Sequence, residues 1–180
     1  KRTLLEQLWH GSLPQAQFLA DDLIPDFYQS YLQTYIERDV RLLADISDWQ
    51  LFGRFVGLLA ALTAQQINAS QLGRELGISP QTARRWTDIL KATFQWFEVP
   101  PFTRNMIKRI SNKPKGYLAD TGIACTAQVI STPRAIASHP MFGALFETAV
   151  VGDIHRLSTV MQPKPNMYHW RTGHGSEVDL

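Results

Sequence analysis

The chain is poor in cysteine, because Cys125 is the only one among its 180 residues. A single cysteine excludes an internal disulfide and a cysteine-rich zinc site. We expect its thiol to be buried as a small apolar group. The five histidines are scattered along the sequence and do not recur at the spacing of metal ligands. The sequence therefore gives no indication of a transition-metal centre.

Long apolar runs are also missing. The best candidate, residues 51–67, is interrupted by Arg54 and by the pair Gln65 and Gln66, so it is not an uninterrupted membrane span. No signal peptide is recognised at the start of the sequence. These absences predict a soluble cytoplasmic protein without a membrane partner.

Phosphate-binding loops are absent as well. No segment matches G-x-x-x-x-G-K-[ST], and the glycine-rich residues 173–176 lack the lysine that such a loop needs. No cofactor is therefore expected for this chain.

What the sequence does contain is an ordered composition with an uneven charge. Hydrophobic residues make up 44% and aromatic residues 11%, enough for a packed core. Residues 54–119 hold ten basic and three acidic residues, a net charge of +7, whereas residues 1–53 carry −4 and residues 120–180 carry −1. Such a concentration of positive charge is typical of a nucleic-acid-binding module. The alternative is an ordinary basic surface patch.

Residues 68–92 have the spacing of a helix-turn-helix. Gly77 is placed to end the first helix with a positive φ angle. Ser79 is placed to cap the second helix, and Pro80 suits its first turn. Apolar residues recur at inward positions of both helices: Leu72, Leu76, Ile78, Ala83, Trp86, Ile89 and Leu90.

The second helix of this unit leaves polar side chains on or near its exposed face. The candidate DNA-binding residues there are Ser79, Gln81, Thr82, Arg84 and Arg85. Guanidinium, amide and hydroxyl groups on a short helix are suited to the DNA major groove. We expect Arg84 and Arg85 to contact DNA, with Gln81 and Thr82 near base edges or phosphates.

A basic segment follows the helix-turn-helix between two predicted strands, 93–99 and 116–119. Its candidate DNA-binding residues are Lys108, Arg109, Lys113 and Lys115. This order of elements is the layout of a winged helix, whose wing adds affinity by lying along phosphates. The alternative is that Lys108 and Arg109 pair with acidic residues elsewhere in the protein.

The other elements are read from apolar periodicity. Residues 1–10, 21–47 and 48–63 are predicted as helices, and an aromatic stripe in the second of these is expected to belong to the core. In the last third, residues 142–157 are predicted as a helix, and residues 167–171 and 177–180 as strands. The sequence stops within the last of these, so we expect a piece of a longer protein.

Three carboxylates in the last third suggest a second kind of chemistry. Glu147 lies on the predicted helix, and Glu177 and Asp179 lie on the final strand. This order is similar to the metal-dependent nuclease core PD-(D/E)XK, in which carboxylates hold Mg²⁺ beside the scissile phosphate. Asp179 and Glu147 are the candidate metal ligands, and all three acids are candidate catalytic residues. The alternative is that they are structural or surface acids of an inactive nuclease-like fold.

Short segments along nearly the whole chain resemble the C-terminal region of a group of prokaryotic predicted AAA+ ATPases. They lie at residues 8–14, 31–40, 68–70, 76–79, 105, 108–109, 113–115, 120–122, 139–140, 146–148, 170–171 and 177–179. The resemblance implies a winged helix next to a restriction-endonuclease-like domain, joined to an ATPase module. It also implies ATP and Mg²⁺ as cofactors of the full-length protein.

Together these observations predict an α+β fold in three parts. Residues 1–47 form a helical segment that adjoins the ATPase module, residues 48–122 a winged-helix domain, and residues 123–180 part of a nuclease-like α/β domain. The expected function is DNA binding as an accessory region of the ATPase, and oligomers are possible. The alternatives are a protein-interaction module without DNA contact and a Mg²⁺-dependent nuclease completed by a further strand.

Overall fold

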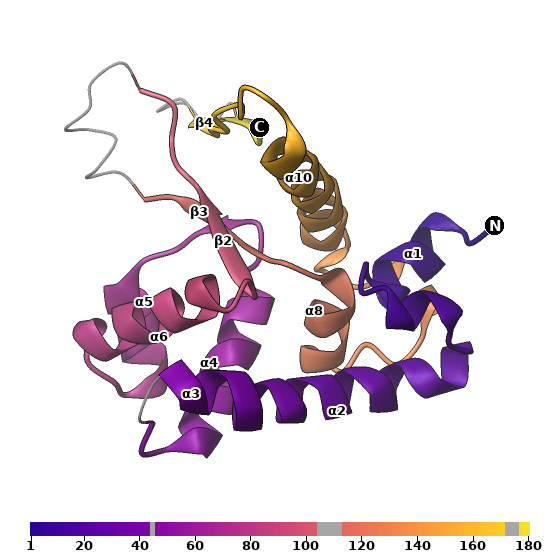
Figure 1. The fold of residues 1–180 in the computed structure, drawn as a ribbon, viewed down its shortest axis with the longest axis horizontal. Helices are drawn as coiled ribbons and strands as arrows, with labels where there is room; N and C mark the ends of the chain where they lie inside the picture. Colours follow the sequence, from indigo (N-terminus) through magenta and orange to yellow (C-terminus); the bar gives the residue numbers. More distant parts are fainter. Residues whose placement is uncertain (44–45, 104–112, 172–176) are drawn as a thin grey trace.

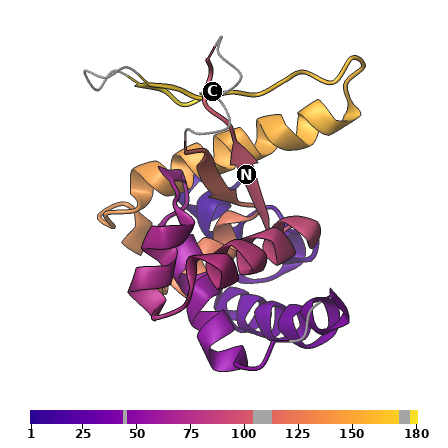
Figure 2. The ribbon, with the colours of Figure 1, turned by 90° about the vertical axis from the view of Figure 1, so that its left-hand side faces the viewer.

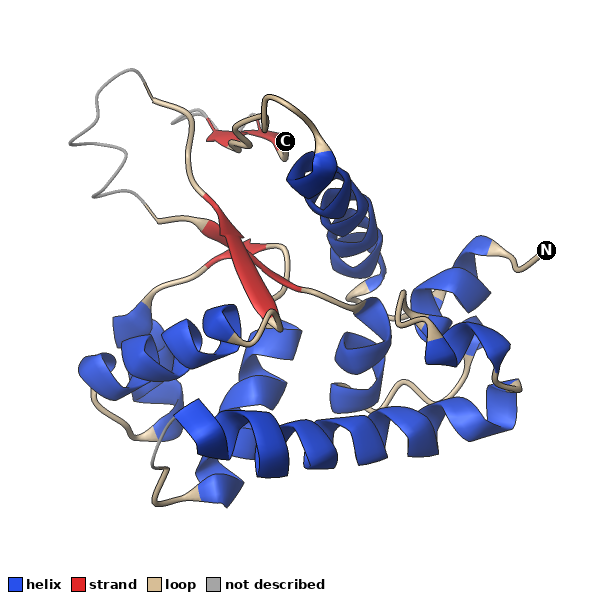
Figure 3. Cartoon of the chain, in the orientation of Figure 1, coloured by secondary structure: helices blue, strands red, loops and turns tan. Residues whose placement is uncertain are grey.

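The computed structural model describes residues 1–43, 46–103, 113–171 and 177–180, and it is an α+β fold in which helices dominate (Figures 1 and 3). The helices are α1 (Leu4–His10), α2 (Ile24–Tyr35), α3 (Arg41–Leu43), α4 (Trp49–Ala61), α5 (Ala69–Leu76), α6 (Pro80–Ala92), α8 (Thr121–Ala127), α9 (Pro133–Ile136) and α10 (Phe142–Val160). Shorter helical turns are η1 (Gln15–Phe18), η2 (Asp21–Leu23) and η3 (Ile36–Val40). The strands are β1 (Gln65–Gln66), β2 (Trp96–Val99), β3 (Lys115–Leu118), β4 (Trp170–Arg171) and β5 (Glu177–Val178). The predicted α+β class is confirmed.

Helix α2 forms the base of the molecule in Figure 1. Two of its predicted stripe residues are fully buried: the Tyr28 hydroxyl donates to the carbonyl oxygen of His10 at 2.7 Å, and the Tyr35 hydroxyl lies within hydrogen-bond distance of Thr93. The predicted helix 21–47 is interrupted, because η2 precedes α2 and the π-helical segment η3 separates it from α3. The assignment of the aromatic stripe to the core is confirmed at these two tyrosines.

The two-helix unit α5–α6 has the local chemistry that its sequence predicts. Gly77 ends α5 with φ of 69°, in the left-handed region. The Ser79 side chain accepts a hydrogen bond from the Thr82 backbone N–H at 3.0 Å, and Pro80 is the first residue of α6. On the inner side, the Trp86 ring packs edge-to-face against Phe52 of α4, with ring centroids 5.4 Å apart. This contact fixes the unit on α4.

The larger sheet has the strand order β1–β3–β2, and both pairings are antiparallel. Strand β3 begins at Lys115, one residue earlier than predicted, and pairs with β2 so that Trp96 lies opposite Leu118. Gly116 lies directly beneath the Trp96 ring, where a Cβ atom would collide with it. Strand β1 was not predicted from the sequence, because its two residues carry no alternating apolar pattern.

One hydrophobic core crosses the predicted domain boundaries at 47/48 and 122/123. It extends from Leu8 of α1 through α2, α4, α6 and α8 to Leu145 of α10. Within it, Cys125 of α8 is 1% exposed, and burial raises the pKa of its thiol to about 12. The thiol is thus a buried apolar group, as predicted. Within the described residues, none of the helices combines the length and apolar character that a membrane span requires.

The C-terminal hairpin β4–β5 forms a separate two-stranded sheet, in which Trp170 pairs with Val178. Figures 1 and 2 show this hairpin at the top of the molecule, above α10 and far from α2. The carbonyl oxygen of His169, just before β4, accepts a 2.6 Å hydrogen bond from the backbone N–H of Phe102. The hairpin is therefore connected to the segment that follows β2.

Candidate functional site

The predicted DNA-binding residues of α6 lie on its outer surface. Gln81, Arg84 and Arg85 are exposed, and they occupy the first two turns of the helix. Within the described residues, the Arg84 guanidinium takes part in no ion pair. Thr82 is half-buried, and its hydroxyl lies 2.9 Å from that of Ser79, so both hydroxyls belong to the helix cap. The arginines and the glutamine therefore form the accessible part of this surface, which we call the α6 face.

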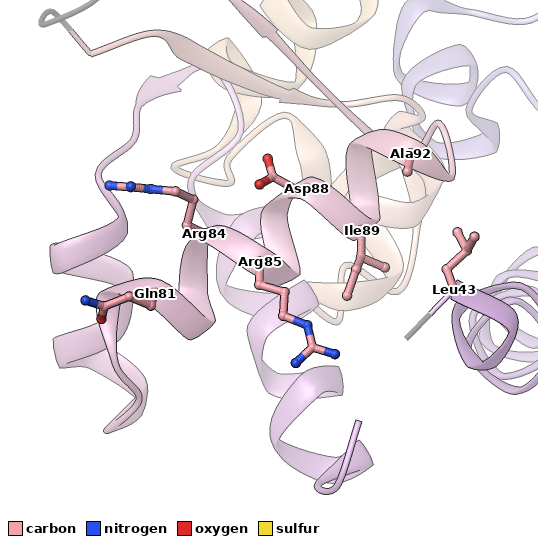
Figure 4. A pocket seen from close by; sticks show the side chains of 7 residues that line it. All are labelled: Leu43, Gln81, Arg84, Arg85, Asp88, Ile89 and Ala92. Carbon is pink, nitrogen blue, oxygen red and sulfur yellow. The ribbon is translucent and has the colours of Figure 1, made fainter. Parts of the chain in front are cut away.

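A shallow groove of ≈ 550 Å³ runs beside the α6 face. Figure 4 shows Gln81, Arg84, Arg85 and Asp88 extending from α6, while Ile89 faces Leu43 of α3 across the groove. Leu43 is 57% exposed. The first half of α6 thus presents polar groups, and its second half borders an apolar margin.

The basic residues of the predicted wing differ in where the structure places them. Lys108 and Arg109 lie outside the described residues, and Lys113 is exposed. Lys115 is different: its side chain is 5% exposed and its ammonium group forms ion pairs with acidic side chains. The expectation that Lys115 lies on a phosphate-facing surface is wrong, because its position in the inner strand β3 turns the side chain away from solvent.

The partners of Lys115 are the three carboxylates that the sequence singled out. The Nζ atom of Lys115 lies 2.8 Å from Glu147 Oε1 of α10, 2.8 Å from Glu177 Oε1 of β5 and 2.6 Å from Asp179 Oδ1. The Tyr117 hydroxyl donates a further hydrogen bond of 2.7 Å to Glu147. The fold therefore brings together residues from β3, α10 and the C-terminal hairpin. We call Lys115, Glu147, Glu177 and Asp179 the lysine–carboxylate cluster.

The electrostatics of this cluster favour a charged lysine. Burial lowers the pKa of the Lys115 ammonium, but hydrogen bonds to Asp179, Glu147 and Glu177 outweigh this effect and raise the pKa above its ordinary value. For the neutral Tyr117 phenol, burial has the opposite effect and raises the pKa, and the hydrogen bond to Glu147 raises it further. Both groups thus remain protonated donors at neutral pH.

The arrangement does not fit the magnesium site that the nuclease resemblance implies. Magnesium takes six oxygen ligands at about 2.0–2.1 Å in near-octahedral geometry. Here the carboxylates are arranged around the Lys115 ammonium, at hydrogen-bond distances from its nitrogen. Among the residues that the structure describes, no group of three or more histidine, cysteine, aspartate or glutamate side chains has the arrangement of a metal site. Glu147 and Asp179 are therefore arranged as partners of an ammonium group and not as magnesium ligands.

Asp120 has a structural role that the sequence did not predict. Asp120 is 3% exposed, and its carboxylate caps α8 by accepting hydrogen bonds from the N–H groups of Gly122 and Ile123. It also accepts hydrogen bonds from Ser12 and Leu13 in the segment after α1. An aspartate directly before Thr121 is a recognisable N-cap signal, but its second set of partners lies more than a hundred residues away.

A known protein family is similar to most of this chain. Residues 1–134 match the family model described as "Domain of unknown function (DUF8612)". The chain belongs to the DUF8612 family. The matched region contains the α6 face and Lys115, and it ends before Glu147.

Two relatives of this DUF8612 chain are similar over almost all of it. Uncharacterized protein Mb2031c of Mycobacterium bovis and Uncharacterized protein Rv2008c of Mycobacterium tuberculosis are each 31% identical to it over 178 residues. The similarity covers 97% of this chain but 39% of each relative. The chain thus spans well under half the length of these curated relatives. No solved structure matches it significantly.

Proposed function

We propose that residues 48–122 form a winged-helix module that binds duplex DNA through the α6 face. The observation that carries the proposal is the exposure of Gln81, Arg84 and Arg85 on the first two turns of a capped helix. Arginine donates in a fixed fork that matches guanine edges and phosphates, and glutamine matches adenine. A helix of 13 residues is about 20 Å long, which suits insertion into the major groove.

The order of elements around α6 supports this proposal. Helices α4, α5 and α6 are followed by the antiparallel strands β2 and β3, and β1 between α4 and α5 pairs with β3. Three helices with a three-stranded sheet in this order are the elements of a winged helix. Trp86 holds α6 against α4, so the inner face of α6 is occupied and its outer face is available to a ligand.

The wing contributes less to the proposal than the helix does. Lys113 is exposed just before β3, and its ammonium suits a phosphate contact. Lys115 has no part in it, because its side chain is buried among carboxylates. We therefore assign recognition to Gln81, Arg84 and Arg85, with Lys113 as an additional phosphate contact.

We further propose that this module positions DNA for a larger protein that contains a predicted AAA+ ATPase. The sequence resemblance supports this role, and the chain covers 39% of the mycobacterial relatives. ATP and Mg²⁺ are in this view cofactors of the ATPase module. The α6 face then acts by binding and orienting DNA, and the reaction takes place elsewhere in the longer protein.

Fluorescence anisotropy with labelled duplex DNA tests the proposal. The logarithm of the binding constant should fall linearly as the logarithm of the salt concentration rises. The double substitution Arg84→Ala with Arg85→Ala should weaken binding and should reduce the slope by about one for each arginine that contacts a phosphate. The matched control is Arg134→Ala with Lys164→Ala, which removes two exposed positive charges that do not belong to α6. Equal binding by the two double variants would refute recognition by α6.

A second candidate function is docking of a protein partner on the same surface. It is favoured by the apolar margin of the groove, where Leu43 faces Ile89 and Ala92. Under this alternative, Leu43→Ser should abolish association with the purified ATPase module, whereas salt should have little effect. Loss of DNA binding in Arg84→Ala with Arg85→Ala, together with unchanged association of Leu43→Ser, would exclude this alternative.

A further inference from the structure

The buried ammonium of Lys115 has a complete set of partners. An ammonium group has three N–H donors and no acceptor, and three different carboxylates lie within 2.6–2.8 Å of Nζ. With a side-chain exposure of 5%, Lys115 is costly to bury unless each donor is satisfied. One donor for each carboxylate meets this requirement.

We propose that the Lys115 ammonium is the resident cation of the lysine–carboxylate cluster, in the place where the nuclease resemblance implies Mg²⁺. In this view the cluster is a metal-free ionic lock. It joins β3 to α10 through Glu147 and to the C-terminal hairpin through Glu177 and Asp179. The proposal does not depend on DNA binding by α6.

The exposure of the acids agrees with this arrangement. The Glu147 side chain is 21% exposed and also accepts from Tyr117, so it has two donors in the interior. Glu177 and Asp179 are 29% and 50% exposed. These two outer carboxylates are more accessible to solvent than Glu147, so their charges cost less than a charge in the interior.

The lock has a structural purpose in the hairpin. Strands β4 and β5 pair over two residues each, and an isolated two-stranded hairpin is marginally stable in water. Trp170 and Val178, which lie opposite each other, remain 44% and 50% exposed, so apolar burial adds little. Backbone hydrogen bonds of His169 connect the start of β4 to the segment after β2, and the ion pairs of Lys115 with Glu177 and Asp179 attach β5 to the body of the protein.

Titration calorimetry with MnCl₂ and MgCl₂ on the 180-residue chain tests the identity of the cation. The unmodified chain is expected to bind neither ion at millimolar concentration. In Lys115→Met the three carboxylates lose their cation, and Mn²⁺ binding is expected to appear. Lys164→Met, at an exposed lysine outside the cluster and outside the proposed DNA-binding surface, is the control and should bind neither ion. Stoichiometric binding of either ion to the unmodified chain, lost in Asp179→Asn, would overturn the proposal.

Hydrogen exchange tests the lock even where Lys115→Met does not fold. In Asp179→Asn, which changes a half-exposed side chain, the β4–β5 amides of Trp170 and Val178 should exchange at least about tenfold faster, which corresponds to about 1.4 kcal/mol. The amides of α5 and α6 should not change. Unchanged exchange in the hairpin, in both Asp179→Asn and Glu177→Gln, would refute the lock.

Discussion

The α6 face and the lysine–carboxylate cluster use positive charge in opposite ways. Arg84 and Arg85 are exposed on the first turns of a helix. Lys115, in strand β3, is 5% exposed and surrounded by three carboxylates. A charge in water costs little and is available to an external anion, whereas a buried charge must be matched within the protein. By their position the exposed arginines can therefore meet an anion outside the protein, whereas the buried Lys115 can contact only groups of the protein itself.

The charge count along the sequence conceals this difference. Residues 54–119 carry a net charge of +7, to which Lys115 and Arg84 each contribute one positive charge. Lys115 lies among three carboxylates, so the cluster as a whole presents no positive charge to a DNA molecule outside the protein. The potential available to DNA then depends on exposed groups such as Arg84, Arg85 and Lys113.

The largest effect is expected from removing the buried charge. Lys115→Met leaves Glu147 without its buried cation, and breaking a buried ion pair costs about 3–5 kcal/mol. Urea unfolding followed by circular dichroism should show a loss of this size. The same substitution at exposed Lys113 should change the free energy of unfolding by less than about 0.5 kcal/mol. Equal losses at both lysines would remove the distinction between the two regions.

A smaller effect is expected when the charge of the α6 face is kept and its geometry is changed. Arg84→Lys with Arg85→Lys retains both positive charges but loses the bidentate fork. Each bidentate contact to a base contributes about 1–3 kcal/mol, so affinity for a DNA site selected with the unmodified protein should fall at least about tenfold. The salt dependence should remain nearly unchanged. Full affinity in this variant would restrict the arginines to phosphate contacts.

The sequence predicted those parts of the fold that depend on neighbouring residues. The cap at Ser79, the positive φ of Gly77 and the buried position of Trp86 follow from local signals. The environment of Lys115 does not, because Glu147 lies 32 residues away and Asp179 lies 64 residues away. The three acids were recognised as a group from their order, but a lysine on the preceding strand has no local pattern that assigns it to them.

A still smaller effect, on the free energy of unfolding, is expected from removing the N-cap side chain of α6. The Ser79 Oγ atom accepts the Thr82 backbone N–H, and replacing such a cap by alanine costs about 1 kcal/mol. Thermal unfolding of Ser79→Ala should reveal this loss. Ser70→Ala, at an exposed serine in the first turn of α5 that is not the cap residue, serves as the control and should be nearly neutral. A neutral Ser79→Ala would mean that tertiary packing alone determines where α6 begins.

The smallest effect concerns His155 of α10, whose imidazole stacks on Phe97 with ring centroids 4.2 Å apart. Burial lowers the pKa of His155, and the nearby charges of Lys164 and Arg156 act in the same direction. The folded state therefore binds this proton less readily than the unfolded state, whose histidine pKa is about 6.5. Its contribution to stability is present above about pH 6.5 and is lost as the pH falls through the lowered pKa.

The lowered pKa of His155 determines the expected result for His155→Gln, which removes both the stacking on Phe97 and the titratable imidazole. At pH 7.5 the variant should be less stable than the unmodified chain, and at pH 5 the difference should shrink, because protonation of His155 destabilises the unmodified chain alone. Urea unfolding at the two pH values measures both differences. A difference that is equal at both pH values would show that His155 takes up its proton as readily in the folded chain as in the unfolded one.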